Sequence, residues 1–303
     1  MPSKTILTDY FEYAPYFRIS YFPFSLLVVT SLLFLSFPFV VAAHTDLTDR
    51  IDVLSHKIKH NPDSLKLYME RGKIYHLRGQ YQKALKDFQL AEKLDPKNVE
   101  VRFEQGLVLL KLGRSKQALA MFNHVLKSDP MYQAALMNRA RVFRSIGDYE
   151  NAAIDYTRVL NGGIALKPED YIEIANNYVE YGQSHYGQAL LVLDLALNKL
   201  GVLVQLQSRA IDIDLLTKNY QSALQRIDIL LTTMHRKEKW LVKKADILLL
   251  LGKPTEAQEN YRMALLSIKK LPAARRNVEA IKNLEAYISK TLLDLTSGKL
   301  RKE

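Results

Sequence analysis

The chain has 303 residues, of which 48% are hydrophobic and 25% charged, a balance typical of a folded protein and not of a disordered one. It contains no cysteine, which excludes disulfides, thiolate metal sites, cysteine nucleophiles and a lipid-modified cysteine anchor. The formal net charge of +11 points to an anionic partner, but residues 235–303 alone carry 16 basic and 8 acidic side chains. The basicity is therefore a property of the C-terminal end.

Residues 1–43 have the features of a targeting segment. No charged residue occurs in residues 24–37, and this length, with Val41-Ala42-Ala43 before His44, favours a signal peptide cleaved at that point. Two acidic residues in a long leading region argue against cleavage, and residues 22–43 are long enough to span a bilayer, so a single-span anchor is the alternative. Under both interpretations the basic residues before the apolar core stay in the cytosol, which places the rest outside it, in the periplasm.

A repeat with a period of 34 residues follows this segment. Proline recurs with this step at Pro62, Pro96 and Pro130. Four further columns keep the same phase, namely Gly72, Gly106 and Ala140; Gly79, Gly113 and Gly147; Ala84, Ala118 and Ala152; and Phe88, Phe122 and Tyr156. A fixed period of this length indicates a chain built from stacked supersecondary units.

Each unit has the pattern of two helices. In the first unit, residues 64–77 and 82–94 both place apolar side chains at helical spacing. Gly79 lies between these segments and can adopt the positive φ that ends a helix. Pro96 prevents the second helix from continuing. Small side chains such as that of Ala84 allow the two helices to approach closely, so each unit is predicted to be a helical hairpin.

These columns resemble the tetratricopeptide repeat (TPR), whose pattern combines small residues where two helices cross, aromatic residues at other positions and a closing proline. The resemblance implies an all-α, right-handed superhelix of helical hairpins with a concave protein-binding groove. It assigns an array over residues 64–270, with repeats at about 65–98, 99–132, 133–167, 168–202, 203–236 and 237–270. The last three repeats are more degenerate and are assigned on Ala175, Gly182, Ala189, Ala223, Gly252, Ala257 and Tyr261, with two extra residues near 184–187.

Both ends of the array are expected to carry capping helices, because stacked repeats need polar outer faces. Residues 44–63 predict an N-terminal capping helix. Residues 271–303 predict a C-terminal capping helix and a basic tail, with one long amphipathic helix over residues 273–295. The whole chain also resembles exported bacterial TPR proteins that begin with a short helix after an Ala-His junction, a family with no assigned reaction.

Motifs for catalysis and cofactor binding are absent from the sequence, including His-Glu-x-x-His, phosphate-loop, Gly-x-Ser-x-Gly and dinucleotide patterns. His56 and His60 share a helix face, but two lysines lie between them and no third ligand is evident, which favours a solvated face over a metal site. Asp212 and Asp214 do not share a face, so we expect solvated or locally paired carboxylates instead of an acid/base couple. We therefore expect no enzyme activity, no cofactor and no metal.

The expected groove is lined by first-helix positions that do not hold the hairpins together. These are Met69, Lys73, His76, Phe103, Leu107, Met137, Asn138, Arg141, Arg144 and Asn176. Some TPR domains bind a terminal carboxylate through a fixed Lys/Asn/Arg set, but Met69 and Lys73 stand where that pattern has lysine and asparagine, so no such clamp is predicted. The basic and apolar lining favours a partner segment with acidic and hydrophobic residues. The alternative is that Arg141 and Arg144 form a solvated helix face.

The basic C-terminal end is concentrated in residues 235–244 and 269–277. Nucleic acid is one partner of such patches, but it is disfavoured outside the cytosol and no nucleic-acid-binding module is present. Anionic lipid, acidic glycan or an acidic protein remains, beside the simpler interpretation of a charged, soluble cap. The sequence thus predicts a non-catalytic protein–protein interaction scaffold of the cell envelope. The alternative is a membrane-tethered assembly factor whose basic end contacts anionic lipid or glycan.

Overall fold

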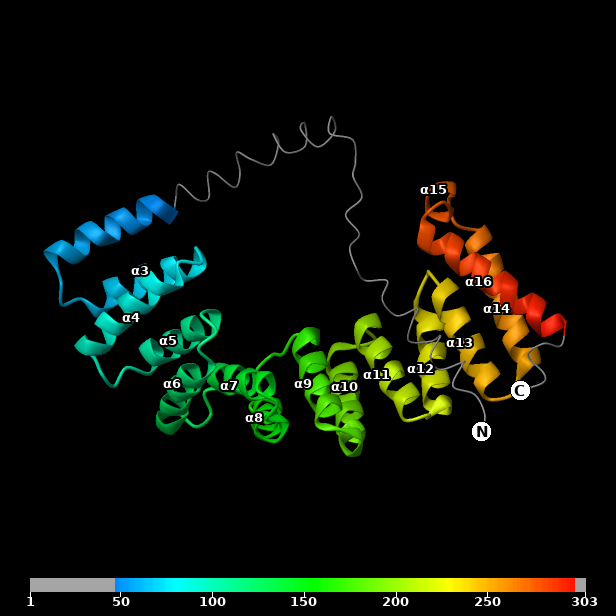
Figure 1. The fold of residues 1–303 in the computed structure, drawn as a ribbon, viewed down its shortest axis with the longest axis horizontal. Helices are drawn as coiled ribbons and strands as arrows, with labels where there is room; N and C mark the ends of the chain where they lie inside the picture. Colours follow the sequence, from blue (N-terminus) through cyan, green and yellow to red (C-terminus); the bar gives the residue numbers. More distant parts are fainter. Residues whose placement is uncertain (1–46, 298–303) are drawn as a thin grey trace. The chain divides into compact units, whose positions relative to one another are not determined.

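The computed structural model describes residues 47–297, and within them the regular structure is entirely helical (Figure 1). This confirms the predicted all-α class and the pairing of consecutive helices. Residues 1–46, which include the predicted targeting segment, and residues 298–303 lie outside the described residues. Between residues 47 and 297, none of the helices combines the length and apolarity that crossing a bilayer requires.

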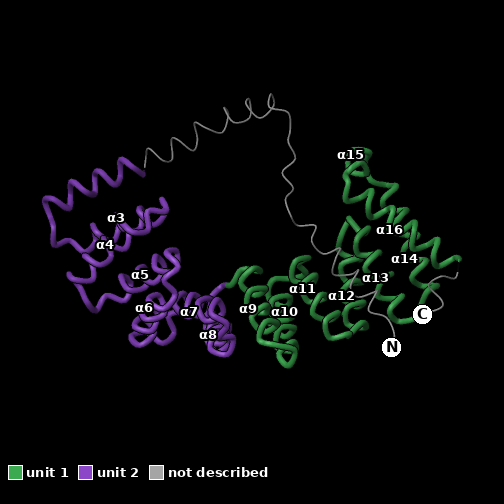
Figure 2. The backbone as a smooth tube through the Cα atoms, in the orientation of Figure 1, with its two compact units in different colours: residues 1–12, 166–303 green, residues 13–165 purple. Residues whose placement is uncertain are grey.

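The chain divides into two compact units, whose described parts are residues 47–165 and 166–297 (Figure 2). The first unit begins with a helix over residues 47–60 and continues with three antiparallel hairpins. The hairpins pair α3 (Leu65–Leu77) with α4 (Tyr81–Leu94), α5 (Val99–Lys111) with α6 (Ser115–Ser128), and α7 (Gln133–Ser145) with α8 (Tyr149–Asn161).

The second unit also contains three hairpins, followed by two further helices. They are α9 (Pro168–Tyr181) with α10 (Tyr186–Leu200), α11 (Val204–Leu216) with α12 (Tyr220–Thr233), and α13 (Glu238–Leu250) with α14 (Pro254–Lys269). A 3-10 turn, η1 (Gln183–His185), accommodates the extra residues of the fourth repeat. The chain then forms α15 (Ala273–Arg276) and α16 (Glu279–Thr296).

Glycine is required where the helices of the first two hairpins cross. A Cβ atom added to Gly72 would lie 2.6 Å from a ring carbon of Phe88, and one added to Gly106 would lie 2.6 Å from the corresponding atom of Phe122. Both rings are fully buried, so neither can move aside without opening the core. The repeating small residue and the repeating aromatic residue therefore form one contact, repeated from hairpin to hairpin.

The turns inside the hairpins depend on positive φ. Gly79 has φ 71°, and its neighbour Gln80 donates its backbone N–H to the carbonyl of Tyr75 at 2.8 Å, which closes the first helix. The fifth repeat has Lys218 at the equivalent place, with φ 57°, the one positive φ outside glycine in residues 47–297. The backbone geometry is thus kept even where the sequence column is lost.

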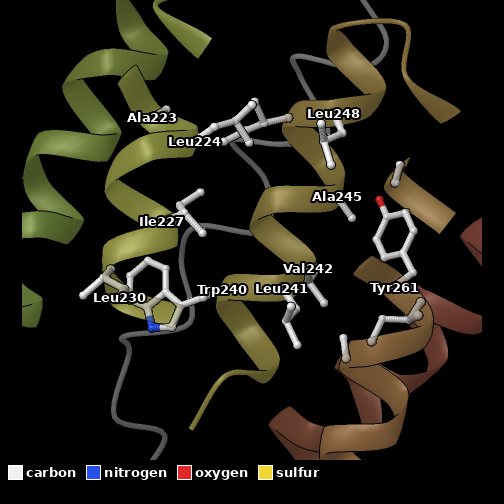
Figure 3. Packing of buried hydrophobic residues seen from close by; sticks show 14 of the residues in the cluster. Ala223, Leu224, Ile227, Leu230, Trp240, Leu241, Val242, Ala245, Leu248 and Tyr261 are labelled. Carbon is white, nitrogen blue, oxygen red and sulfur yellow. The ribbon is translucent and has the colours of Figure 1, made fainter. Parts of the chain in front are cut away.

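The core of the second unit runs between successive helices. In Figure 3, Ile227 and Leu230 of α12 face α13, and the indole of Trp240 lies beside Leu230. Trp240 is 3% exposed, and Tyr261 of α14 is fully buried on the other side of α13. Helix α13 therefore packs against α12 of the preceding repeat on one side and against α14 on the other.

Helices cover both ends as capping helices would. The helix over residues 47–60 packs Ile51 and Leu54 against Ile74 of α3. At the other end, the single helix expected over residues 273–295 is wrong: Asn277 and Val278 separate α15 from α16, and Val278 has extended backbone angles. The interruption redirects the chain so that α16 packs on α14, with Ile288 and Leu295 buried in the core of the unit. No glycine or proline marks this break.

Candidate functional site

The first helices of adjacent hairpins lie next to one another. In the first unit α3 contacts α5 and α5 contacts α7, while in the second unit α9 contacts α11. Each unit thus has a continuous surface formed by its first helices, which we call the first-helix face. All ten residues expected to line a groove belong to these helices.

Two of the expected lining residues are not on the surface. Met69 and Met137 are each 6% exposed and belong to the hydrophobic core, so their assignment to the groove is wrong. Each directly follows a buried residue, Tyr68 or Leu136, and both neighbours face inward because the helix is covered on two sides. Helical spacing alone does not reveal this second covered side.

Lys73 is on the face, but its charge is already compensated. Its Nζ lies 2.6 Å from Oε1 of Glu100 and 3.8 Å from Oε1 of Glu104, both on α5. The hydrogen bond to Glu100 is the main reason why the pKa of Lys73 is raised. Burial raises the pKa of Glu104, with Lys73 acting in the opposite direction. One cation and two carboxylates leave this region without the positive charge expected there.

An aromatic pair lies beside these charges. Phe103 of α5 and Tyr132, which precedes α7, have ring centroids 5.2 Å apart, and both are partly buried. Burial and then Glu100 raise the pKa of the Tyr132 hydroxyl. Leu107, one turn after Phe103, is also partly buried. Apolar side chains and a carboxylate pair therefore meet on the α3–α5–α7 part of the face.

The remaining expected residues are engaged within the protein. His76 packs edge-on against Tyr81 at 5.8 Å, and burial, followed by the charge of Lys111, lowers the pKa of its imidazole. Asn138 donates its Nδ2 to the carbonyl of Ala134 at 2.8 Å. Arg141, Arg144 and Asn176 are partly buried; neither arginine lacks a partner, and Asn176 accepts from Nε of Arg209 at 2.7 Å. An entirely solvated face does not describe these residues.

Polar contacts also join the first helices of the second unit. Beside the Arg209–Asn176 contact, Gln205 of α11 donates to Glu169 of α9 at 3.0 Å. Lys243 of α13 lies 2.7 Å from Oδ1 of Asp212 of α11. Side chains therefore cross-link the face, and they include Asn176, which the sequence assigns to the lining of the groove.

Three arginine clusters escaped the sequence analysis. Arg71 binds Asp87 through two hydrogen bonds of 2.8 and 2.7 Å and donates to Ser55 of the preceding helix at 2.9 Å. Arg139 repeats this arrangement with Asp155 and Asn123, 68 residues later. The step of 68 residues is twice the repeat period, so the recurrence of Arg and Asp at this spacing is the sequence feature that could have revealed both clusters. Each bidentate pair joins the two helices of one hairpin, and the third hydrogen bond of the arginine reaches the helix before that hairpin.

The third cluster contains a buried carboxylate. Asp214, which the sequence leaves as solvated or locally paired, is 0% exposed and accepts from Ser222 and from Nε of Arg226, each at 2.9 Å. Arg226 also binds both oxygens of Asp194 on α10. Burial raises the pKa of Asp214, and the bonds to Ser222 and Arg226 oppose this shift. Pairing with Ser222 and Arg226 accounts for the burial of the Asp214 carboxylate without an acid/base role.

The geometry of the described residues is that of a binding surface. Within residues 47–297, no group of three or more His, Asp or Glu side chains could hold a metal ion. His56 and His60 have ring centroids 4.4 Å apart but stand without a third ligand of this kind. The first-helix face instead presents partly buried aromatic, aliphatic and carboxylate groups in fixed positions, which is the chemistry of a recognition surface.

Comparison with known families gives the same architecture. A family model described as TPR repeat matches residues 72–113, and one described as tetratricopeptide repeat matches residues 103–170. No curated protein matches the chain. These matches cover the better preserved repeats of the first unit and end where α9 begins.

Solved structures extend the likeness over most of the chain. A tetratricopeptide repeat protein from Parabacteroides merdae is 19% identical, with 86% of this chain and 98% of that chain covered and a TM-score of 0.50. The C-terminal part of a TPR repeat-containing protein from Cytophaga hutchinsonii is 12% identical, with coverages of 78% and 96% and a TM-score of 0.60. PilW, a widely conserved type IV pilus biogenesis factor, is 20% identical, with coverages of 68% and 93% and a TM-score of 0.51. At these identities the likeness to solved structures shows the fold alone, and the family matches identify tetratricopeptide repeats over residues 72–170.

Proposed function

We propose that this protein is a non-catalytic scaffold that binds an extended segment of a protein partner on the first-helix face of residues 47–165. Tetratricopeptide repeats serve in general as protein-interaction modules, which supports the class of function. The observation that carries the proposal for this chain is the Phe103–Tyr132 pair with Leu107 beside it. These side chains are apolar, partly exposed and held in place by buried neighbours.

The chemistry of the face also limits which kinds of partner segment it can bind. Lys73 is neutralised by Glu100 and Glu104, so α3 and α5 do not offer the positive charge that would attract acidic residues of a partner segment. An apolar side chain against Phe103 and Leu107, with polar backbone or a basic group toward Glu100, suits this surface better. An aromatic anchor in a largely desolvated position is the kind of contact that dominates protein interfaces.

Site-specific photocrosslinking tests the proposal. A photoreactive phenylalanine analogue in place of Leu107 should form an adduct with the partner in cells. The same analogue in place of Ile154, an exposed apolar residue on the second helix α8, is the matched control and should not. Phe103→Ala should reduce the Leu107 adduct at least about tenfold, as expected for an anchor worth about 1.4 kcal/mol or more. Equal adducts from both positions, or an adduct only from Ile154, would rule out the first-helix face.

We also propose that the protein works in the cell envelope, on the side away from the cytosol. Support comes from the sequence of residues 1–43, whose long uncharged apolar run precedes the first repeat. A type IV pilus biogenesis factor has a similar fold, and this likeness names no specific envelope role for the chain.

N-terminal sequencing of the exported product tests this address. A product that starts at His44 is expected for a cleaved signal peptide. An intact Met1 in the membrane fraction, with the repeats accessible to external protease, would indicate the anchor instead. An intact chain in the cytosolic fraction, protected from external protease, would refute both.

A further inference from the structure

The last hairpin brings together basic segments that are distant in sequence. Because α13 and α14 are antiparallel, the start of α13 and the end of α14 lie at the same end of the hairpin. The α12–α13 connection, α15 and the start of α16 gather at this end of the second unit (Figure 1). Six exposed cations, which we call the basic end, belong to these segments: Lys237, Lys239, Lys269, Lys270, Arg275 and Arg276.

The basic end differs from most other cations of the last hairpin because no carboxylate pairs with it. Arg236 is paired with the buried Glu238 at 3.2 Å, and Lys244 lies 2.5 Å from Asp228. Lys253, at the opposite end of the same hairpin, is paired with Glu256 at 3.1 Å. Across the described part of the chain, no carboxylate comes within 4.0 Å of any of the six cations of the basic end.

Lys239 lies close to two cations outside the basic end, Lys243 and Arg236. Its Nζ lies 4.5 Å from the centroid of the Trp240 ring, which holds the ammonium over the hairpin. Burial lowers the pKa of Lys239, and the neighbouring Lys243 and Arg236 lower it further. The charge of Asp212 acts in the opposite direction but is the smallest of these effects, so an anion placed here would further relieve the repulsion.

Apolar side chains are exposed among the cations. Val278, directly after the Arg275-Arg276 pair and Asn277, is 50% exposed, and Leu266, one turn before Lys269, is 57% exposed. A surface that mixes unpaired lysine and arginine with exposed aliphatic tips suits the headgroup region of a membrane, where charge and apolar surface are both satisfied. Charged groups alone would suit any polyanion.

We propose that the basic end binds an anionic membrane surface, with its lysines and arginines on the lipid phosphates and Val278 at the acyl boundary. This inference goes beyond the binding of a partner on the first-helix face, which lies on another unit and does not depend on it. Lipid contact at the basic end orients the scaffold relative to the membrane, independently of how residues 1–43 are processed.

A single fluorophore tests the contact in the full chain. Since the sequence has no cysteine, Asn277→Cys gives one labelling site at the basic end for an environment-sensitive dye. The dye should shift to shorter wavelength with vesicles of phosphatidylcholine and phosphatidylglycerol, compared with phosphatidylcholine alone. The shift should disappear in about 1 M salt, where the Debye length falls to roughly 3 Å. The same dye on Leu251→Cys, at the opposite turn, should not respond.

Charge reversal at two sets of four cations distinguishes the effect of where the cations lie from the effect of the net charge of the protein. Changing Lys269, Lys270, Arg275 and Arg276 to Glu should weaken the lipid-dependent response roughly 100-fold or more, since each cation near an anionic bilayer contributes about fivefold. The control reverses Lys97, Arg114, Lys116 and Lys127, four exposed cations of the first unit, and should retain the response. An unchanged emission of Trp240, the single tryptophan, shows that the last repeat is folded. If the fourfold variant unfolds, Lys269→Gln with Lys270→Gln should still weaken the response by about 25-fold.

Three results would overturn the proposal. One is a dye response that does not depend on phosphatidylglycerol. Another is a response that survives both high salt and the fourfold reversal. The third is an equal response to soluble polyglutamate without vesicles, which would assign the basic end to an acidic protein.

Discussion

At the scale of the residue, one backbone conformation recurs at the turn of five hairpins, and it does not require glycine in all of them. Gly79, Gly113, Gly147 and Gly252 all have φ near 70–80° at the turn of their hairpins, and Lys218 occupies the same conformation. A residue with a Cβ atom in this region costs about 1 kcal/mol relative to glycine. The fifth repeat therefore carries a local strain that its relatives within the chain avoid.

Replacing Lys218 with Gly should remove this strain. We expect Lys218→Gly to raise the free energy of unfolding of the second unit by about 0.5–1 kcal/mol, measured by urea denaturation with Trp240 fluorescence. Lys253→Gly is the matched control, because Lys253 has φ −109° and gains nothing from glycine. That control should lower stability by a similar amount, through the greater freedom of the unfolded chain. A loss of stability in both variants would contradict the strain at position 218.

At the scale of the element, α16 is attached to the last repeat by a partly buried carboxylate. Oδ1 of Asp246 on α13 accepts from the hydroxyl of Tyr261 on α14 at 2.5 Å and from that of Tyr287 on α16 at 2.9 Å. Burial raises the pKa of Asp246 to about 6, against the effect of both tyrosines and of Lys243. Asp246 also raises the pKa of both phenols, after burial itself. Three helices thus share one hydrogen-bonded group.

Because the pKa of Asp246 is higher in the folded than in the unfolded chain, protonation favours the folded state. Its contribution is complete below about pH 4 and is lost as the pH rises through about 6. The free energy of unfolding should therefore fall by about 1–3 kcal/mol across this window in the wild type. Asp246→Asn should reduce this slope in urea titrations followed by Trp240 fluorescence, whereas the exposed Asp63→Asn should leave it unchanged. Equal slopes for wild type and Asp246→Asn would exclude Asp246 as the origin.

At the scale of the whole molecule, the sequence predicts the hairpins better than it predicts the site. The columns of Gly72 and Phe88 encode a direct contact, so their period is enough to deduce the crossing of two helices. The lining of the face depends on which third helix covers each position, and that is not periodic. Met69 is buried and Lys73 is bound to Glu100 for this reason, although both have surface-like spacing. The break before α16 likewise follows from packing on α14 and has no local signal.

The η1 turn offers a position at which a segment can be inserted into the chain. It takes up extra residues between α9 and α10, while Ala175 and Ala189 remain buried where these helices pack. Gln183 and Ser184 in it are exposed, and Tyr181 stacks on His185 at 3.9 Å across the turn. A hairpin crossing is set by side chains inside the helices and not by the length of the link between them. An epitope or a reporter domain inserted between Gln183 and Ser184 would therefore leave the helical contacts on either side intact.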